Sequence, residues 1–134
     1  MQTIVVAVIS GLFSSLLSVW FTLRAQRKME VRRQKIETIR ELAGYRFVLI
    51  DIKTAGIGDK SRFSSALNQV FVIFADDAKV MAALQEFHTA IISHLDSQLV
   101  NDKLVSLFKA LAKSADVDFS HLNDAFFLTP FSHP

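Results

Sequence analysis

The feature that most constrains this chain is an uncharged stretch near its N-terminal end. From Thr3 to Leu23 the sequence contains no Asp, Glu, Lys or Arg and is rich in Val, Ile, Leu and Phe. As an α-helix, a stretch of this length would extend roughly 32 Å, which matches the hydrocarbon core of a bilayer. A cleaved signal peptide is the alternative, but the basic start and the small-x-small cleavage site of such a peptide are missing. We therefore predict a transmembrane anchor over residues 1–23.

The residues that follow this stretch predict its orientation. Trp20 lies near the end of the predicted span, where Trp favours the membrane interface. Cations follow directly, and we expect them to contact lipid headgroups: Arg24, Arg27, Lys28, Arg32 and Arg33. Because an excess of Lys and Arg marks the cytoplasmic flank of a span, the N-terminus is predicted outside and residues 24–134 in the cytoplasm.

Charge is divided unevenly along the chain. Residues 1–46 carry eight Lys or Arg against three Glu, whereas residues 47–134 carry seven Lys or Arg against ten acids. A basic segment directly after an apolar one matches anionic lipid headgroups. Nucleic-acid contacts usually need aromatic or loop residues that this segment lacks. The predicted partner of the N-terminal region is therefore the lipid bilayer and not nucleic acid.

Small side chains recur every four residues along the predicted anchor. One row includes Ala7, Gly11 and Ser15, and an adjacent row includes Ser14 and Ser18. Membrane helices approach closely where side chains are small, and Ser hydroxyls form hydrogen bonds between helices. We therefore expect a homo-oligomer packed through the anchor. The alternative is that small residues are simply frequent in membrane helices.

Residues 24–134 are predicted to form a small antiparallel helical bundle, so the expected fold class is all-α. Residues 24–43 continue the anchor as a basic juxtamembrane helix, with no breaker before Gly44. Residues 45–52 are β-prone in composition but have partly helical spacing, so helix and strand both remain open. In all, four helices are expected after the anchor.

Three amphipathic patterns follow Gly58. The first predicts a helix whose whole apolar face is buried, formed by Phe63, Ala66, Leu67, Val70, Phe71 and Phe74. The second, capped by Asp76 or Asp77, has an apolar stripe formed by Val80, Leu84, Phe87, Ile91 and Leu95. The third, with Asp96 or Ser97 as its cap, ends near Ser114 and has a stripe formed by Val100, Leu104, Leu107, Phe108 and Leu111. Asn68, beside the first stripe, is expected to form hydrogen bonds within the core or to specify helix pairing.

The C-terminal tail is aromatic. Residues 116–134 contain Phe119, Phe126, Phe127 and Phe131, which makes them too apolar for a free disordered end. We expect the tail to pack back on the bundle. Docking on a partner or on the membrane surface is the alternative.

Candidate catalytic or metal-binding residues do not converge in this sequence. His88 and His94 are six residues apart, which places them on different faces of a helix, and the chain has no Cys. We therefore predict a protein that is not an enzyme and has no cofactor. The alternative is a site assembled across an oligomer from Arg46, Asp51 and His88, although an internal pair between Arg46 and Asp51 is the simpler interpretation.

Several segments together suggest a family. They are the pattern Ala66-Leu67-Asn68-x-Val70-x-Val72-x-Phe74, the pair Lys79-Val80, and the run from Leu107 to Lys113 that leads into Asp118-Phe119. In these segments the chain resembles a family of small bacterial proteins of unknown function, which have one N-terminal membrane helix and a helical cytoplasmic domain. The resemblance implies a location in the inner membrane and implies no biochemical activity.

The function expected from these features is that of a membrane-anchored interaction or scaffold protein without enzymatic activity. It would self-associate through its anchor and bind a cytoplasmic protein partner. The alternative is an oligomeric effector that permeabilises the membrane, as in stress responses or phage defence.

Overall fold

The computed structural model describes residues 2–46, 48, 56–93 and 96–128, with side chains described from Ser15 onward. All regular elements in these ranges are helices, which confirms the all-α class. The chain divides into two compact units, Met1–Arg33 and Gln34–Pro134. The first unit consists of one helix, and the second contains the hydrophobic core.

Helix α1 covers Gln2–Gly44 and contributes residues to both units. The predicted continuation of the N-terminal helix to about residue 43 is confirmed. No helix among the described residues is long and apolar enough to cross a membrane. The membrane span predicted at residues 3–23 is therefore not supported by the structure, in which the side chains of residues 2–14 are not described.

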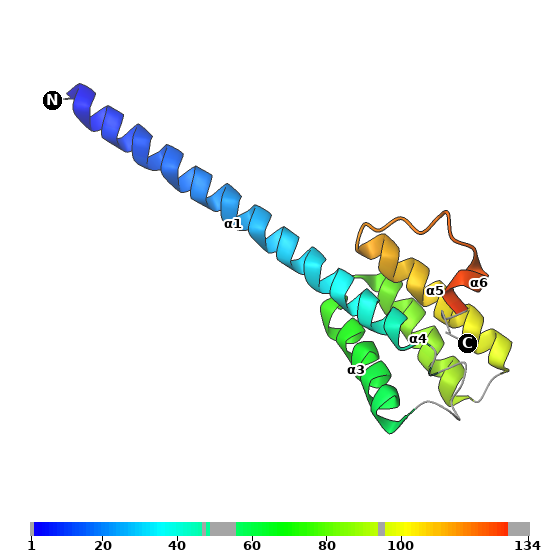
Figure 1. Cartoon of the computed structure of the whole chain (residues 1–134). Coiled ribbons are helices and arrows are strands. Elements are labelled where there is room, and N and C mark those ends of the chain that lie inside the picture. Colours follow the sequence, from blue (N-terminus) through cyan, green and yellow to red (C-terminus); the bar gives the residue numbers. More distant parts are fainter. Residues whose placement is uncertain (1, 47, 49–55, 94–95, 129–134) are drawn as a thin grey trace. The chain divides into compact units, whose positions relative to one another are not determined.

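The second unit adds four helices to the end of α1: α3 (Ile57–Ile73), α4 (Ala78–Ile92), α5 (Ser97–Ser114) and the short α6 (Asp124–Leu128). Helices α4 and α5 pack side by side, and α6 lies against α5 (Figure 1). The prediction of four helices after the anchor missed α6. Most of the ambiguous segment 45–52 lies outside the described residues, although Tyr45 and Arg46 form a turn.

The two predicted helix caps have different outcomes. The Asp77 carboxylate accepts hydrogen bonds from the backbone N–H groups of Lys79 at 3.1 Å and Val80 at 3.3 Å, so it caps α4 as predicted. Asp96 occupies the cap position of α5, but its side chain makes no capping hydrogen bond. Its backbone carbonyl accepts the first hydrogen bond of this helix, from the Val100 N–H at 3.1 Å.

The core draws on every helix of the second unit. Its buried side chains include Leu42 from α1, Val70 from α3, Phe87 from α4, Leu107 from α5 and Phe127 from α6. Polar contacts join α1 and the turn after it to α3. Gln69 donates to Glu41 at 3.0 Å, and Arg62 donates to the Tyr45 hydroxyl at 2.7 Å. The second unit is therefore a packed domain.

The predicted burial of α3 is only partly correct. Phe63, Ala66, Val70 and the following Phe74 are buried, whereas Phe71 is 60% exposed. Phe71 lies at the edge of the apolar stripe, roughly 60° around the helix from the direction of Phe74. Asn68 is also exposed, so its predicted role inside the core is wrong.

The aromatic tail packs on α5, as predicted. The Phe127 ring stacks on the Phe108 ring with centroids 5.9 Å apart, and it meets the edge of the Phe119 ring at 5.8 Å. Phe126 is exposed, and Phe131 lies outside the described residues. The chain turns toward this contact at Asp116, whose φ of 56° follows directly on the end of α5.

Candidate functional site

The first unit exposes an apolar helix surface between Leu16 and Leu23. Its exposed side chains are Leu16, Leu17, Val19, Trp20, Phe21 and Leu23. Because the first unit has only one helix, no second element of that unit covers them. Monomeric soluble proteins rarely expose apolar patches this continuous, and such patches mark contacts with a protein or a membrane. This surface is the strongest candidate site among the residues that the structure describes.

The predicted packing residues of the anchor fall into two groups. Ser15 and Ser18 are exposed on α1, whereas the side chains of Ala7, Gly11 and Ser14 are not described. One turn after Ser18, the Thr22 hydroxyl donates to the Ser18 carbonyl at 2.8 Å. This hydroxyl is therefore satisfied within the helix, as a polar group in lipid must be.

A basic helix surface follows the apolar one. The Arg24 guanidinium lies 5.3 Å from the centroid of the Trp20 ring, within the range of a cation–π contact. Arg27, Lys28 and Arg32 are exposed on the next turns of the same helix. These side chains are exposed along α1, where phosphate or carboxylate groups can reach them.

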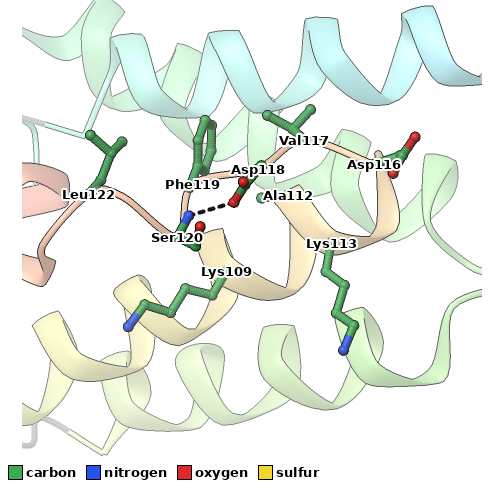
Figure 2. A pocket seen from close by; sticks show the side chains of 9 residues that line it. All are labelled: Lys109, Ala112, Lys113, Asp116, Val117, Asp118, Phe119, Ser120 and Leu122. Atoms are coloured by element: carbon green, nitrogen blue, oxygen red, sulfur yellow. Dashed lines mark hydrogen bonds between the residues drawn. The ribbon is translucent and has the colours of Figure 1, made fainter.

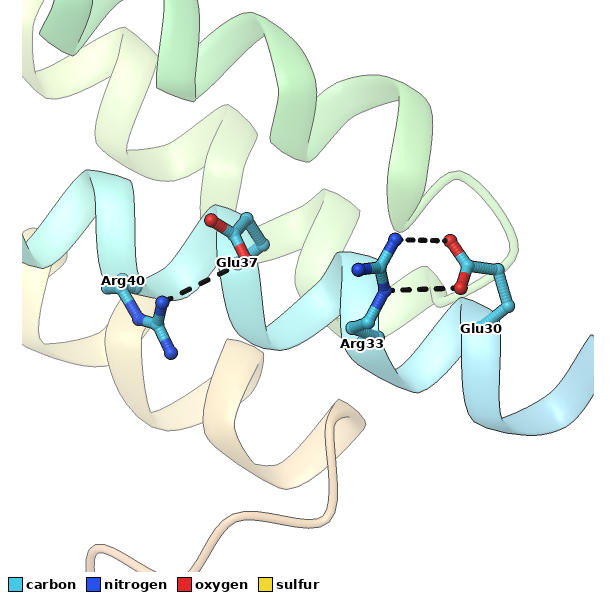
Figure 3. A network of polar contacts seen from close by, with 4 residues as sticks. All are labelled: Glu30, Arg33, Glu37 and Arg40. Carbon is cyan, nitrogen blue, oxygen red and sulfur yellow. Dashed lines mark hydrogen bonds and ion pairs between the residues drawn. The ribbon is translucent and has the colours of Figure 1, made fainter.

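Arg33 lies beside an acidic residue one turn earlier on α1. Its guanidinium makes two contacts with the Glu30 carboxylate, with Nε at 3.1 Å and an Nη atom at 3.2 Å (Figure 3). Further along α1, in the second unit, Arg40 lies 4.0 Å from Glu37 in the same spacing. The Glu30 carboxylate offsets the positive charge of Arg33 toward an external anion.

The second unit has an apolar groove between α3 and α4. It has a volume of about 420 Å³ and is lined by Leu67, Asn68, Phe71, Met81, Leu84, Gln85, Phe87, His88 and Ile91. Its lining includes no carboxylate, lysine or arginine, so it suits an apolar group and not a charged one. Phe71 was predicted to lie in the core, so the groove was missed. The only related signal in the sequence is that Phe71 lies at the edge of its apolar stripe.

A more polar hollow lies beside the last turns of α5. It has a volume of about 500 Å³ and is bordered by Lys109, Lys113 and the loop Asp116–Leu122 (Figure 2). Two of its charged side chains, Lys109 and Asp118, already make contacts within the protein. Lys109 contacts the Asp124 carboxylate at 2.6 Å, and the Asp118 carboxylate accepts from the Ser120 backbone N–H at 2.8 Å. The hydrogen bonds from Ser120 lower the pKa of Asp118, and the polar groups of this hollow therefore serve to hold the loop.

The alternative enzymatic site is not assembled by the described residues. Arg46 is half-buried, and burial lowers its pKa. His88 is exposed in the groove, and Asp51 and His94 lie outside the described residues. Within the described part of the chain, no cluster of three or more His, Cys, Asp or Glu side chains has the geometry to hold a metal ion.

No protein-family model matches this chain, and neither a curated protein nor a solved structure is significantly similar to it. The resemblance to small bacterial membrane proteins therefore stays a prediction.

Proposed function

We propose that this protein is a membrane-anchored interaction protein without enzymatic activity, which self-associates through residues 1–23. The observation that carries the proposal is the exposed apolar surface of α1 from Leu16 to Leu23, which no other element of its unit covers. The sequence extends this apolar character back to Thr3. Lipid covers such a helix all round, which a single protein groove does not.

The distribution of side chains on α1 supports self-association. Ser18 belongs to the small-residue rows, and Trp20 lies roughly 200° around the helix from Ser18. The small face can therefore pack against a second copy while Trp20 faces lipid or headgroups. Close backbone approach and Ser hydrogen bonds would then hold the copies together.

The proposed orientation places the N-terminus outside an inner membrane and the helical unit in the cytoplasm. The run of cations after Leu23 supports this orientation, because Lys and Arg are enriched on the cytoplasmic flank of a membrane span. The helical unit then serves as the part that meets a cytoplasmic protein, and the groove between α3 and α4 is an apolar concavity on its surface.

In-cell crosslinking of the intact chain, beside a version that lacks residues 1–23, tests the proposal. Because the chain has no Cys, single cysteines can be placed at will. Ser18→Cys should form disulfide dimers in membranes, whereas Leu16→Cys, roughly 200° away on α1, should not. Equal crosslinking at both positions, or a full-length chain recovered in the soluble fraction, would remove the anchor-packing model.

A second candidate function is a membrane-permeabilising effector. The Ser residues at positions 10, 14 and 18 favour it, because a polar row can line an aqueous path when several copies assemble. Dye leakage from cells that overexpress the full chain would support this function. Intact membranes at high expression levels would leave the scaffold function as the proposal.

A further inference from the structure

Four of the five Lys and Arg side chains of the first unit lie on one face of α1. Trp20, Arg24, Arg27, Lys28, Val31 and Arg32 recur at i, i+4, i+7, i+8, i+11 and i+12. This spacing confines their side chains to an arc of roughly 140° on an α-helix. We call this set the basic stripe. Met29 and Arg33 lie on the other side of the helix, where Arg33 is paired with Glu30.

The members of the basic stripe lie at different distances from Trp20 along the helix axis. If Trp20 marks the membrane interface, Arg24 lies roughly 6 Å beyond it along the helix axis, and Arg32 lies roughly 18 Å beyond it. The headgroup layer on each side of a bilayer is only about 5 to 8 Å thick. A helix that stood upright would therefore carry Arg32 well past the phosphates.

A tilted helix removes this discrepancy. If α1 leans toward the bilayer on the side of the stripe, Arg27, Lys28 and Arg32 approach the surface together. An isolated upright helix gains nothing from placing its cations on one side, because the membrane surface surrounds it equally. The one-sided arrangement is thus matched to a surface that lies along one side of residues 24–32.

We propose that the basic stripe is a binding site for anionic phospholipid headgroups, which tilts α1 against the membrane surface. This inference rests on the proposed anchor. The stripe supplies guanidinium and ammonium groups, which pair with phosphate oxygens. Arg24 stacks on the Trp20 ring at 5.3 Å, which fixes the first cation at the level of the interface. Zwitterionic lipid, with no net charge, should not hold the stripe.

Two matched probes report on the two faces of the helix. Val31 lies in the stripe and Met29 lies opposite, and both are exposed apolar side chains. In the Cys-free full chain, Val31→Cys and Met29→Cys can each carry a nitroxide label. The labelled proteins are placed in nanodiscs of phosphatidylcholine, with or without phosphatidylglycerol, and accessibility to a water-soluble relaxation agent is measured.

With phosphatidylglycerol present, we expect a several-fold lower aqueous accessibility at position 31 than at position 29. In phosphatidylcholine alone the two positions should be equal. Changing Arg24, Arg27, Lys28 and Arg32 to Gln should abolish the difference, because Gln preserves helix propensity without charge. The matched control, Glu30→Gln with Arg33→Gln, removes the charges of the opposite face and should preserve the difference.

Equal accessibility at both positions in anionic nanodiscs, with the protein inserted, would overturn this proposal and leave the anchor intact. Failure of the full chain to enter any nanodisc, with Trp20 fully open to aqueous quenchers, would overturn the anchor and the stripe together. Inorganic phosphate and a single-stranded RNA, added to phosphatidylcholine nanodiscs, test the other anions. Protection of position 31 by either of these, but not by phosphatidylglycerol, would overturn the assignment to lipid.

Discussion

The Lys35 ammonium donates a hydrogen bond to the Ser114 hydroxyl at 3.1 Å, although 79 residues separate them in the sequence. The same ammonium lies 5.1 Å from the centroid of the buried Phe74 ring. Ser114 also forms a hydrogen bond with Asp77, and this bond is the main cause of the lowered pKa of that carboxyl. One polar chain thus connects α1, the turn before α4 and the last residue of α5.

Replacing Ser114 with Ala should destabilise the helical unit by about 1 kcal/mol, the usual net value of a lost hydrogen bond. The loss should come from the contacts with Lys35 and Asp77 together. Urea unfolding of the full chain in mild detergent, followed by circular dichroism, measures it. Ser106→Ala is the control, because the exposed Ser106 hydroxyl donates only to the Asp102 carbonyl. A cost no greater than the control's would contradict this role.

Asp77→Ala should cost about 1 kcal/mol, because it removes the cap of α4. The pKa of Asp77 is lowered in the folded chain, so its stabilisation is present above the unfolded pKa of about 3.9 and is lost as pH falls through the folded value. The gap between wild type and variant should therefore be constant near neutral pH and shrink below about pH 4. Asp76→Ala, one residue away and exposed, should leave the free energy of unfolding nearly unchanged at neutral pH.

Phe74→Ala and Phe71→Ala form a pair that tests which face of α3 is buried. Phe74 is fully buried, and its truncation should cost about 3 to 5 kcal/mol. Phe71 is largely exposed in the groove, and its truncation should cost about 1 kcal/mol or less. The midpoint of urea unfolding gives both values. If the Phe71 variant proved as unstable as the Phe74 variant, the groove would be closed in solution.

The periodicity of apolar residues predicted the main helices and most of their buried faces, but not the exposure of Phe71 or the presence of α6. Phe63, Val70 and Phe74 are buried because they lie at the centre of their stripe. The exposure of Phe71 depends on how far α4 reaches around α3, and the sequence of one helix holds no information on that distance. Helix α6 was missed for a related reason. Five residues are too few for a periodic signal, and the helix is held by the contact of Phe127 with Phe108.

Parts of the candidate site could be predicted from local sequence, and other parts depend on how the helices pack. The uncharged run and the cations after it are features of composition, so they could be recognised in the sequence. The ion pair between Arg33 and Glu30 joins residues three apart on one helix, so it also depends on local sequence. The groove needs two helices that meet at a particular angle. Its lining residues Leu67, Met81 and His88 therefore come together only in the folded unit.

Phe127→Ala should release the tail from α5 before the rest of the unit unfolds. Phe127 is buried between Phe108 and Phe119, and α6 is too short to persist without this contact. Hydrogen exchange of the full chain should then show faster exchange over 117–128 while α4 stays protected. Phe126→Ala, at the exposed neighbouring position, is the control. Exchange that rises equally in α4 would mean that the tail and the bundle unfold as one unit.

Gly11→Leu with Ser15→Leu should abolish self-association if the small-residue face packs two copies together. Each Leu adds a branched side chain where the backbones are expected to approach closely, and lipid accepts the same Leu without cost. Single-molecule photobleaching or crosslinking in membranes gives the oligomeric state. Ile9→Leu with Leu16→Ile changes apolar side chains outside the small-residue rows and should leave the oligomer intact. An oligomer that survives Gly11→Leu and Ser15→Leu must be held by the helical unit, and the exposed groove between α3 and α4 would then be the next surface to mutate.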